Sequence, residues 1–126
     1  MMNHENFFKS PIVLRRIVGF LILDILLRGD YHGYDLWKKL EEILGTKIPH
    51  PIVYKILKEF EEMGLVVGRW VSAKSGPARK IYSITIDGVM ILKHNLELFR
   101  KIRDLLSTII EHVESVDLSS FSKSRS

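Results

Sequence analysis

Apolar residues after position 52 recur at the three- and four-residue steps that place side chains on one face of an α-helix. Pro49 and Pro51 fit only before or within a first helical turn, and Gly64 is the residue type that commonly ends a helix in the left-handed conformation. The sequence therefore predicts a helix between Pro49 and Gly64 with one buried face. That face is formed by Val53, Ile56, Leu57, Phe60 and Met63.

The period of the pattern changes after Gly64. Leu65 to Val71 is rich in β-branched and aromatic residues, residues 75–77 form a Ser-Gly-Pro turn signal, and Ile81 to Ile86 resumes the strand-like composition. We therefore expect two strands joined by a loop. A helix that runs directly into such a hairpin is the outline of a helix-turn-helix domain with a β-hairpin wing.

Two further helices are expected before this one. The first is apolar on almost every side, with Ser10 as its cap and Pro11 as its first residue, and it ends near Leu27. This run contains Asp24 and is too short to cross a bilayer. It also begins too far into the chain, and lacks the cleavage site of small residues, to resemble a secretion signal. We interpret it as a buried helix of a cytoplasmic protein that has no membrane partner.

The second helix follows an interruption at residues 28–34, which contains two glycines, and it ends near Leu44. A turn of a few residues, Gly45 to Ile48, then separates it from the helix that begins near Pro49, as helix-turn-helix packing requires. Its inward positions are predicted to be Leu36, Trp37, Leu40, Ile43 and Leu44.

A last helix is predicted from Asp87 to Val116, where apolar residues again step by threes and fours. At about 1.5 Å per residue it is roughly 40 Å long, which exceeds the small domain that precedes it. Its own subunit cannot cover all of this apolar stripe, so we expect the helix to form a homodimer to which the first helix also contributes. The predicted interface residues are Leu96, Phe99, Ile102, Leu106, Ile109 and Val113.

Together these elements predict a mostly α protein with a small β-hairpin wing, an α+β fold in which a winged helix-turn-helix is joined to a long C-terminal dimerisation helix. The winged domain is expected to span residues 1–86 and the dimerisation helix residues 87–116. Residues 117–126 are rich in serine and are expected to form a disordered tail. A chain of 126 residues can bury one modest core, or one small domain plus an extension that needs a partner, so we do not expect a second independent domain.

The positive charge of the chain is concentrated in the predicted hairpin. Between Leu65 and Ile86 there are four cations and no carboxylate, a local charge of +4 that equals the formal net charge of the whole chain. The other residues are balanced, with 15 basic against 15 acidic side chains. This location favours a polyanionic partner whose phosphates the wing contacts. The four cations are Arg69, Lys74, Arg79 and Lys80.

Three stretches of the sequence resemble the PadR family of transcriptional regulators. Residues 29–36, Gly-Asp-Tyr-His-Gly-Tyr-Asp-Leu, resemble the family turn G-x-x-HGY-[DE]-L. Residues 54–66 resemble its recognition-helix pattern Y-x-x-L-x-x-L-E-x-x-G-L-[IV], and residues 76–88 resemble its wing pattern GP-x-RK-x-Y-x-[LI]-T-x-x-G. The similarity covers roughly residues 20–90. It implies a dimeric winged helix-turn-helix regulator that binds DNA, most often as a repressor.

The resemblance and the residue chemistry together point to a DNA-binding face on the third helix and the wing. Residues off the inward side of that helix can reach base edges or phosphates if the helix enters a major groove. Relatives commonly carry Ser or Thr at the position of Ile52 and Gly at that of Pro51, so their operator contacts do not transfer to this chain. We predict that a palindromic operator in double-stranded DNA is contacted by Tyr54, Lys55, Lys58, Lys74, Arg79 and Lys80.

Two alternatives remain open from the sequence. The first is a winged-helix protein-interaction module, which would use the wing or the long helix to hold a protein partner without sequence-specific DNA binding. The second concerns an effector, because relatives sometimes bind flat aromatic compounds at the dimer interface and Trp37 and Trp70 could line such a cavity. A small aromatic effector is therefore a candidate partner, although the place of Trp37 on an inward stripe favours plain core packing.

Enzymatic and metal chemistry find no support in the sequence. There is no cysteine, so neither a disulfide nor a thiolate zinc site can form. His94 and His112 lie on one helix face but roughly 27 Å apart, and His32 and His50 stand beside turns, where local hydrogen bonds are favoured over ligation. No metalloprotease, serine-hydrolase or phosphate-loop motif occurs. We therefore expect no enzymatic activity, no metal and no cofactor.

Overall fold

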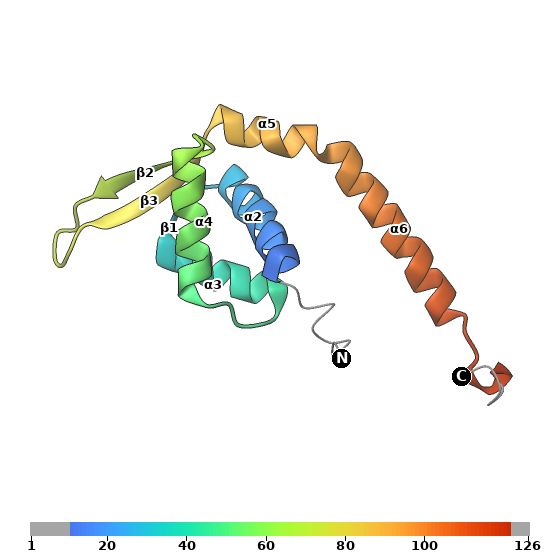
Figure 1. Ribbon diagram of the computed structural model, residues 1–126. Helices are drawn as coiled ribbons and strands as arrows, with labels where there is room; N and C mark the ends of the chain where they lie inside the picture. Colours follow the sequence, from blue (N-terminus) through green and yellow to red (C-terminus); the bar gives the residue numbers. More distant parts are fainter. Residues whose placement is uncertain (1–10, 122–126) are drawn as a thin grey trace. The chain divides into compact units, whose positions relative to one another are not determined.

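The computed structural model describes residues 11–121 and is mostly helical, with one small antiparallel sheet (Figure 1). The fold class predicted from the sequence is thereby confirmed. The chain divides into two compact units, of which the first ends at Lys93 and the second begins at His94. In chain order the elements are α2 (Pro11–Leu27), β1 (Tyr31–His32), α3 (Gly33–Leu44), α4 (His50–Glu62), β2 (Val66–Val71), β3 (Arg79–Ile84), α5 (Ile86–His94), α6 (Leu96–Glu114) and the 3₁₀ helix η1 (Leu118–Ser120).

The core of the first unit is built on α2. The helices α3 and α4 each contribute the apolar side of an amphipathic helix to it, and the sheet closes it through β2 and β3. Burial of one such side chain contributes roughly 1.5–3 kcal/mol to stability, so this cluster is the main source of the unit's cohesion. The buried members are Val18, Ile22, Leu23, Ile25, Leu26, Leu36, Leu40, Ile48, Val53, Ile56, Leu57, Val66 and Tyr82.

One side of α2 stays uncovered within the described part of the chain. Val13 and Ile17 are 52% and 46% exposed, and the ion pair of Asp24 with Arg28 lies further along the same side of the helix. The sequence led us to expect cover on nearly all sides. The predicted cap, Ser10, lies outside the described residues. An apolar strip on α2 is therefore available to another surface.

The predicted helix boundaries around α4 are confirmed. Pro49 is the residue before its first turn, Pro51 lies within that turn, and Gly64 follows its end with a φ of 74°. Gly45 ends α3 in the same left-handed conformation, with a φ of 66°. Only glycine adopts such angles at little cost. Met63 was expected on the buried face, but it lies beyond the last turn and is 57% exposed.

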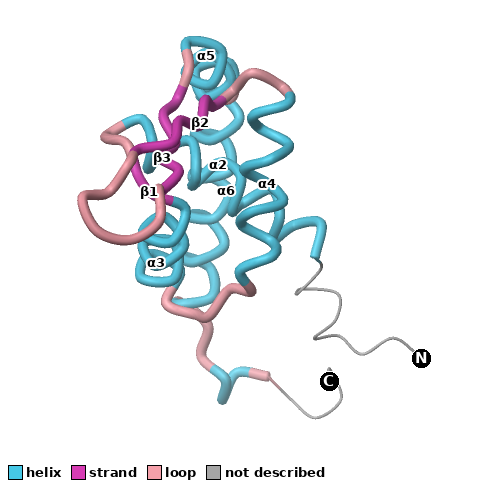
Figure 2. The backbone as a smooth tube through the Cα atoms, turned by 90° about the vertical axis from the view of Figure 1, so that its left-hand side faces the viewer, coloured by secondary structure: helices cyan, strands magenta, loops and turns pink. Residues whose placement is uncertain are grey.

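The sheet has three strands in the order β1, β3, β2, all antiparallel (Figure 2). The hairpin pairs Val66 with Ile84 at its base and Val71 with Arg79 at its far end. The short strand β1 was not expected, because the sequence analysis treated residues 28–34 as an interruption. It pairs Tyr31 with Tyr82 and thereby joins the start of α3 to the wing.

Ile86 was predicted to end the second strand of the hairpin, but it is the first residue of α5. The reason is the side chain of Thr85. Its hydroxyl accepts a hydrogen bond from the backbone N–H of Gly88 at 3.1 Å, as in a helix N-cap, and donates one to the carbonyl of Gly64 at 2.6 Å. Thr85 therefore stops the strand and starts a helix.

Three further expectations are corrected. The single helix predicted for residues 87–116 is divided into α5 and α6 at Asn95, a residue type whose side chain competes with helical backbone hydrogen bonding. In α3, Ile43 was expected to face inward but is 44% exposed. The inward row of Leu36 and Leu40 is continued by Leu44. At the end of the chain Leu118–Ser120 forms η1, with Asp117 as its cap, while residues 122–126 of the predicted tail lie outside the described residues.

Replacing Gly88 by alanine should destabilise the first unit. The new β-carbon would lie 2.4 Å from the carbonyl oxygen of Leu65 and 2.6 Å from Cγ1 of Ile84. Forced overpacking of this kind costs about 1–3 kcal/mol, so urea denaturation should show a lower midpoint with an unchanged slope. Gly29→Ala is the matched control, because no other group lies within 4 Å of its β-carbon. Equal midpoints for the two variants would contradict the close contact.

Candidate nucleic-acid interface

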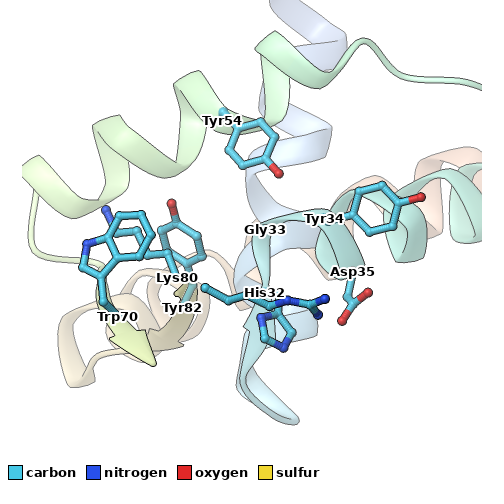
Figure 3. Close-up of a pocket in the computed structure, with 9 residues that line it drawn as sticks. His32, Gly33, Tyr34, Asp35, Tyr54, Trp70, Lys80 and Tyr82 are labelled. Carbon is cyan, nitrogen blue, oxygen red and sulfur yellow. The ribbon is translucent and has the colours of Figure 1, made fainter. Parts of the chain in front are cut away.

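A surface groove of about 500 Å³ lies where the first turn of α3, the side of α4 and the wing converge (Figure 3). Aromatic rings and two cations line it. The groove takes one residue from α4 and the others from the segment 32–35 and the two wing strands. Its lining residues are His32, Gly33, Tyr34, Asp35, Tyr54, Trp70, Arg79, Lys80 and Tyr82.

The helix α4 presents opposite chemistry on its two sides. Val53, Ile56 and Leu57 are buried in the core, whereas Lys55 and Lys58 are exposed. Because the buried side fixes the helix, the exposed side is held in a constant orientation beside the groove. Such a helix can offer cations and hydrogen-bond donors to a partner without loss of its own packing.

A glycine lets α3 and α4 approach closely at the groove. A β-carbon on Gly33 would lie 2.6 Å from a ring carbon and 3.1 Å from the hydroxyl oxygen of Tyr54. Only a residue without a side chain fits beneath that ring. The His-Gly-Tyr sequence at 32–34 therefore places Tyr54 directly over the first turn of α3 (Figure 3).

A row of aromatic rings continues from α3 to the first turn of α4. The ring centroids of Trp37 and His50 are 3.8 Å apart, those of Tyr34 and Trp37 are 5.6 Å apart, and those of His50 and Tyr54 are 6.1 Å apart. The indole N–H of Trp37 also donates to the carbonyl of Ile48 at 2.6 Å. These contacts fix the turn between the two helices and with it the start of α4.

Two of the four wing cations are neutralised by carboxylates from outside the hairpin. The guanidinium of Arg69 lies 3.4 Å from a carboxylate oxygen of Asp30, and Nζ of Lys80 donates to Oε1 of Glu61 at 2.8 Å. The local charge of +4 counted along the sequence is therefore not all available to a ligand. Among the residues that the structure describes, Lys74 and Arg79 form no ion pair.

The carboxylates of α4 fall into three different environments. Glu59 pairs with Arg15 of α2, and the hydrogen bond from that guanidinium lowers the pKa of Glu59. Glu61 reaches across to Lys80 of β3, and Glu62 is exposed. Glu59 thus points toward α2. Only Glu61 and Glu62 could repel a polyanion that approaches the exposed side of α4.

A family model described as the transcriptional regulator PadR-like family matches residues 22–94. This span includes α3, α4, the wing and the groove. The chain belongs to the PadR-like family of transcriptional regulators. Members of this family are transcriptional regulators.

Individual relatives agree with this assignment. The transcriptional regulator YqjI of Escherichia coli K12 is 34% identical over 79 residues, which are 61% of this chain and 36% of YqjI. The PadR-like chain thus spans about a third of the length of that curated relative.

Solved structures show the same fold. The protein TA0346 of Thermoplasma acidophilum has a TM-score of 0.70 and 27% identity, and the alignment covers 83% of this chain and 98% of TA0346. Bacillus subtilis PadR, solved in complex with operator DNA, has a TM-score of 0.58 and 27% identity, with 64% of this chain and 46% of PadR covered.

The structure brings together only some of the six residues for which DNA contacts were predicted in this PadR-like chain. Tyr54, Arg79 and Lys80 line the one groove, and Lys55 and Lys58 are exposed on the same helix as Tyr54. Lys74 is exposed in the loop between β2 and β3. Whether these side chains touch DNA remains a prediction.

Sequence reasoning did not identify Tyr34 and His50 as part of this surface. The signal that could have found them is aromatic spacing, since His50 and Tyr54 are four residues apart on α4 and follow Tyr34 and Trp37 on α3. For His32 a local hydrogen bond was expected, but its Nδ1 is buried and has no hydrogen-bond partner among the described residues.

The effector hypothesis placed Trp37 and Trp70 in one cavity. The structure separates their environments. Trp37 is partly buried and packs against the core, as its inward position favoured, whereas Trp70 lies on β2, is 69% exposed and lines the groove. Within residues 11–121, no helix is long and apolar enough to cross a membrane.

Alkaline pH should destabilise the first unit because Lys80 and Tyr82, which line the groove, lose their protons. The hydrogen bond to Glu61 raises the pKa of Lys80, and burial raises the pKa of Tyr82. The folded state thus holds both protons more tightly than the unfolded chain, so the contribution is complete below about pH 10 and is lost as the pH rises through the raised values. Denaturation midpoints measured from pH 8 to 12 should therefore fall, and Tyr82→Phe should reduce the fall.

The exposed Tyr34 provides the control for this measurement. Tyr34→Phe removes a phenol from the same groove without removing a buried one, and it should leave the alkaline fall unchanged. A Tyr82→Phe curve that runs parallel to the wild-type curve would show that Tyr82 is not coupled to folding in this range.

Proposed function

We propose that this chain is a cytoplasmic, homodimeric transcriptional repressor that binds a palindromic operator in double-stranded DNA. The observation that carries the proposal is the exposed face of α4, where Lys55 and Lys58 lie at the surface while the other side of the helix is buried. A family member, Bacillus subtilis PadR, has been solved with operator DNA. The exposed face of α4 on this chain carries two cations on a helix that its buried side holds in place.

The helix α4 enters the major groove in this proposal. Tyr54, Lys55 and Lys58 reach base edges or phosphates from its exposed side. The wing follows the backbone, where Lys74 and Arg79 meet phosphates. The groove between α4 and the wing then receives the sugar-phosphate strand, with the aromatic rings against its sugars and Arg79 against its charge.

The dimer is proposed to form through α6. None of the residues of this helix is buried within the described part of the chain, although its hydrophobic side chains form a continuous stripe. Leu106 and Ile109 at its centre are 53% and 56% exposed. A second copy of the same helix would cover the stripe symmetrically. The exposed strip of α2 at Val13 and Ile17 would extend the interface.

The symmetry of the dimer determines the proposed operator. Two copies of α4 related by a two-fold axis read two half-sites of opposite orientation, which are about 34–36 Å apart on one face of the duplex. A dimer that occupies such a site next to a promoter excludes the polymerase from it. This steric effect is the basis for proposing repression.

Selection of bound fragments from random duplex DNA tests the proposal directly. The wild-type chain should enrich a palindrome whose half-sites are about one helical turn apart. The Lys55→Ala variant should then discriminate less at particular base positions, by roughly 1–3 kcal/mol, if that lysine reads a base. Recovery of no preferred sequence, together with no salt-sensitive duplex binding, would contradict the proposal and leave the protein-interaction module as the better account.

The double substitution Leu106→Glu with Ile109→Glu should yield a monomer. It places four carboxylates in a two-fold seam, where desolvation and like-charge repulsion both oppose association. Sedimentation should report one subunit, and operator affinity should fall by orders of magnitude because the second domain no longer binds at high effective concentration. Circular dichroism should still show a folded winged unit.

The matched control for this variant changes the net charge equally on the polar side of α6. Lys101→Gln with Thr108→Glu also makes the chain more negative by two charges, at two exposed positions between the apolar ones. This control should remain dimeric. If the Leu106 and Ile109 variant also remains dimeric, the seam does not lie on α6.

A further inference from the structure

One ion pair joins the end of α4 to the wing. Glu61 lies in the last turn of α4, and its Oε1 accepts a hydrogen bond from Nζ of Lys80 on β3 at 2.8 Å. The side chains are 28% and 29% exposed, so both charges are partly withdrawn from water. In that position water and salt screen the attraction between the two charges less than they do on an open surface.

The surrounding side chains fit this ion pair closely. The ammonium of Lys80 lies 5.4 Å from the ring centroid of Tyr82 and 5.9 Å from that of Trp70, within the range of cation–π attraction (Figure 3). On the neighbouring strand, a β-carbon at Gly68 would lie 2.4 Å from Cε of Lys80 and 3.0 Å from Oε2 of Glu61. The absence of a side chain at position 68 therefore leaves the space that the pair occupies.

Lys80 also lines the groove beside Arg79, where the proposed function places a DNA strand. A lysine that already has a carboxylate partner carries little net charge toward an approaching phosphate. Resting on that proposed function, we infer that Glu61 is a specificity-determining residue: it retains Lys80 in an intramolecular ion pair that a DNA phosphate must displace, and so weakens binding to random duplex more than binding to the operator.

Glu61 affects binding to random and to operator DNA differently because the two kinds of duplex make different contacts with the chain. Random duplex attracts the chain only through phosphate charge, and a neutralised lysine adds almost nothing to that attraction. At an operator the contacts between α4 and the bases hold the DNA backbone against the wing. One DNA phosphate can then compete with Glu61 for Lys80 at short range. Lys80 thus contributes a phosphate contact only after the sequence has been read.

Glu61→Gln tests the inference by releasing Lys80 with almost no change of shape. The variant should bind random duplex roughly three- to tenfold more tightly at 0.1 M salt, and the dependence of log affinity on log salt should steepen by about 0.9 for each domain bound. Glu62→Gln is the matched control, since Glu62 is the next residue, is exposed and forms no ion pair among the described residues. It should give a clearly smaller gain.

A double-mutant cycle separates the ion pair from a general loss of negative charge. In a Lys80→Met background, Glu61→Gln should increase the affinity for random duplex no more than Glu62→Gln does in the same background. The inference is overturned if Glu61→Gln and Glu62→Gln tighten binding equally in the wild-type background, or if the extra gain from Glu61→Gln persists without Lys80.

A second measurement uses the unaltered protein and so does not depend on the folding of any variant. The side-chain resonances of Lys80, assigned with the Lys80→Met spectrum, should stay unchanged on saturation with random duplex and shift with the selected palindrome. Equal shifts with both duplexes would overturn the inference while the proposed function stands. Absence of any duplex binding by the wild-type chain would instead contradict the proposed function, and the inference with it.

Discussion

The burial of α2 is the constraint on which the first unit depends. This helix offers apolar side chains in nearly every direction, and α3, α4 and the sheet cover the side that carries Val18, Ile22 and Leu26. Each of the two following helices has only one apolar side. Once that side lies on α2, the polar side must face solvent. The exposure of Lys55 and Lys58 to solvent is thus a consequence of core burial rather than a separate feature of the fold.

Two close contacts then join this core to the surface around the groove. Gly33 allows the ring of Tyr54 to lie against the start of α3, and Thr85 links the end of α4 to the beginning of α5 through one hydroxyl. Both contacts join segments that are 21 residues apart. The helix α4 is therefore held near its start by α3 and at its end by the base of the wing.

Much of the fold could be predicted from the sequence because it depends on local periodicity. Some signals determine the conformation only of residues close to them in the chain. They are the apolar steps in α4, the prolines at its start and the glycines that end α3 and α4. The strand β1 could not be predicted, since two residues carry no period and Tyr31 is extended only because Tyr82 pairs with it. The break at Asn95 was hidden by an apolar pattern that continues across it.

The residue types of the candidate site could be predicted from the sequence, but the share of its positive charge that is paired with carboxylates could not. A count of cations along the hairpin could not include Asp30 and Glu61, because these carboxylates are far from Arg69 and Lys80 in the chain and meet them only after folding. The same holds for the aromatic row, whose members come from two helices. Local composition therefore identified the wing as basic and overestimated how much of its charge is free.

Gly68 has a consequence for how relatives of this chain can diverge. Its missing side chain provides the space in which Glu61 meets Lys80, so the three positions are coupled by geometry. A larger residue at 68 would force the side chains of Glu61 and Lys80 to move from where they now meet. Glycine at the first position should therefore co-occur with the acidic and basic residues at the other two, and the loss of any one should release the others to drift.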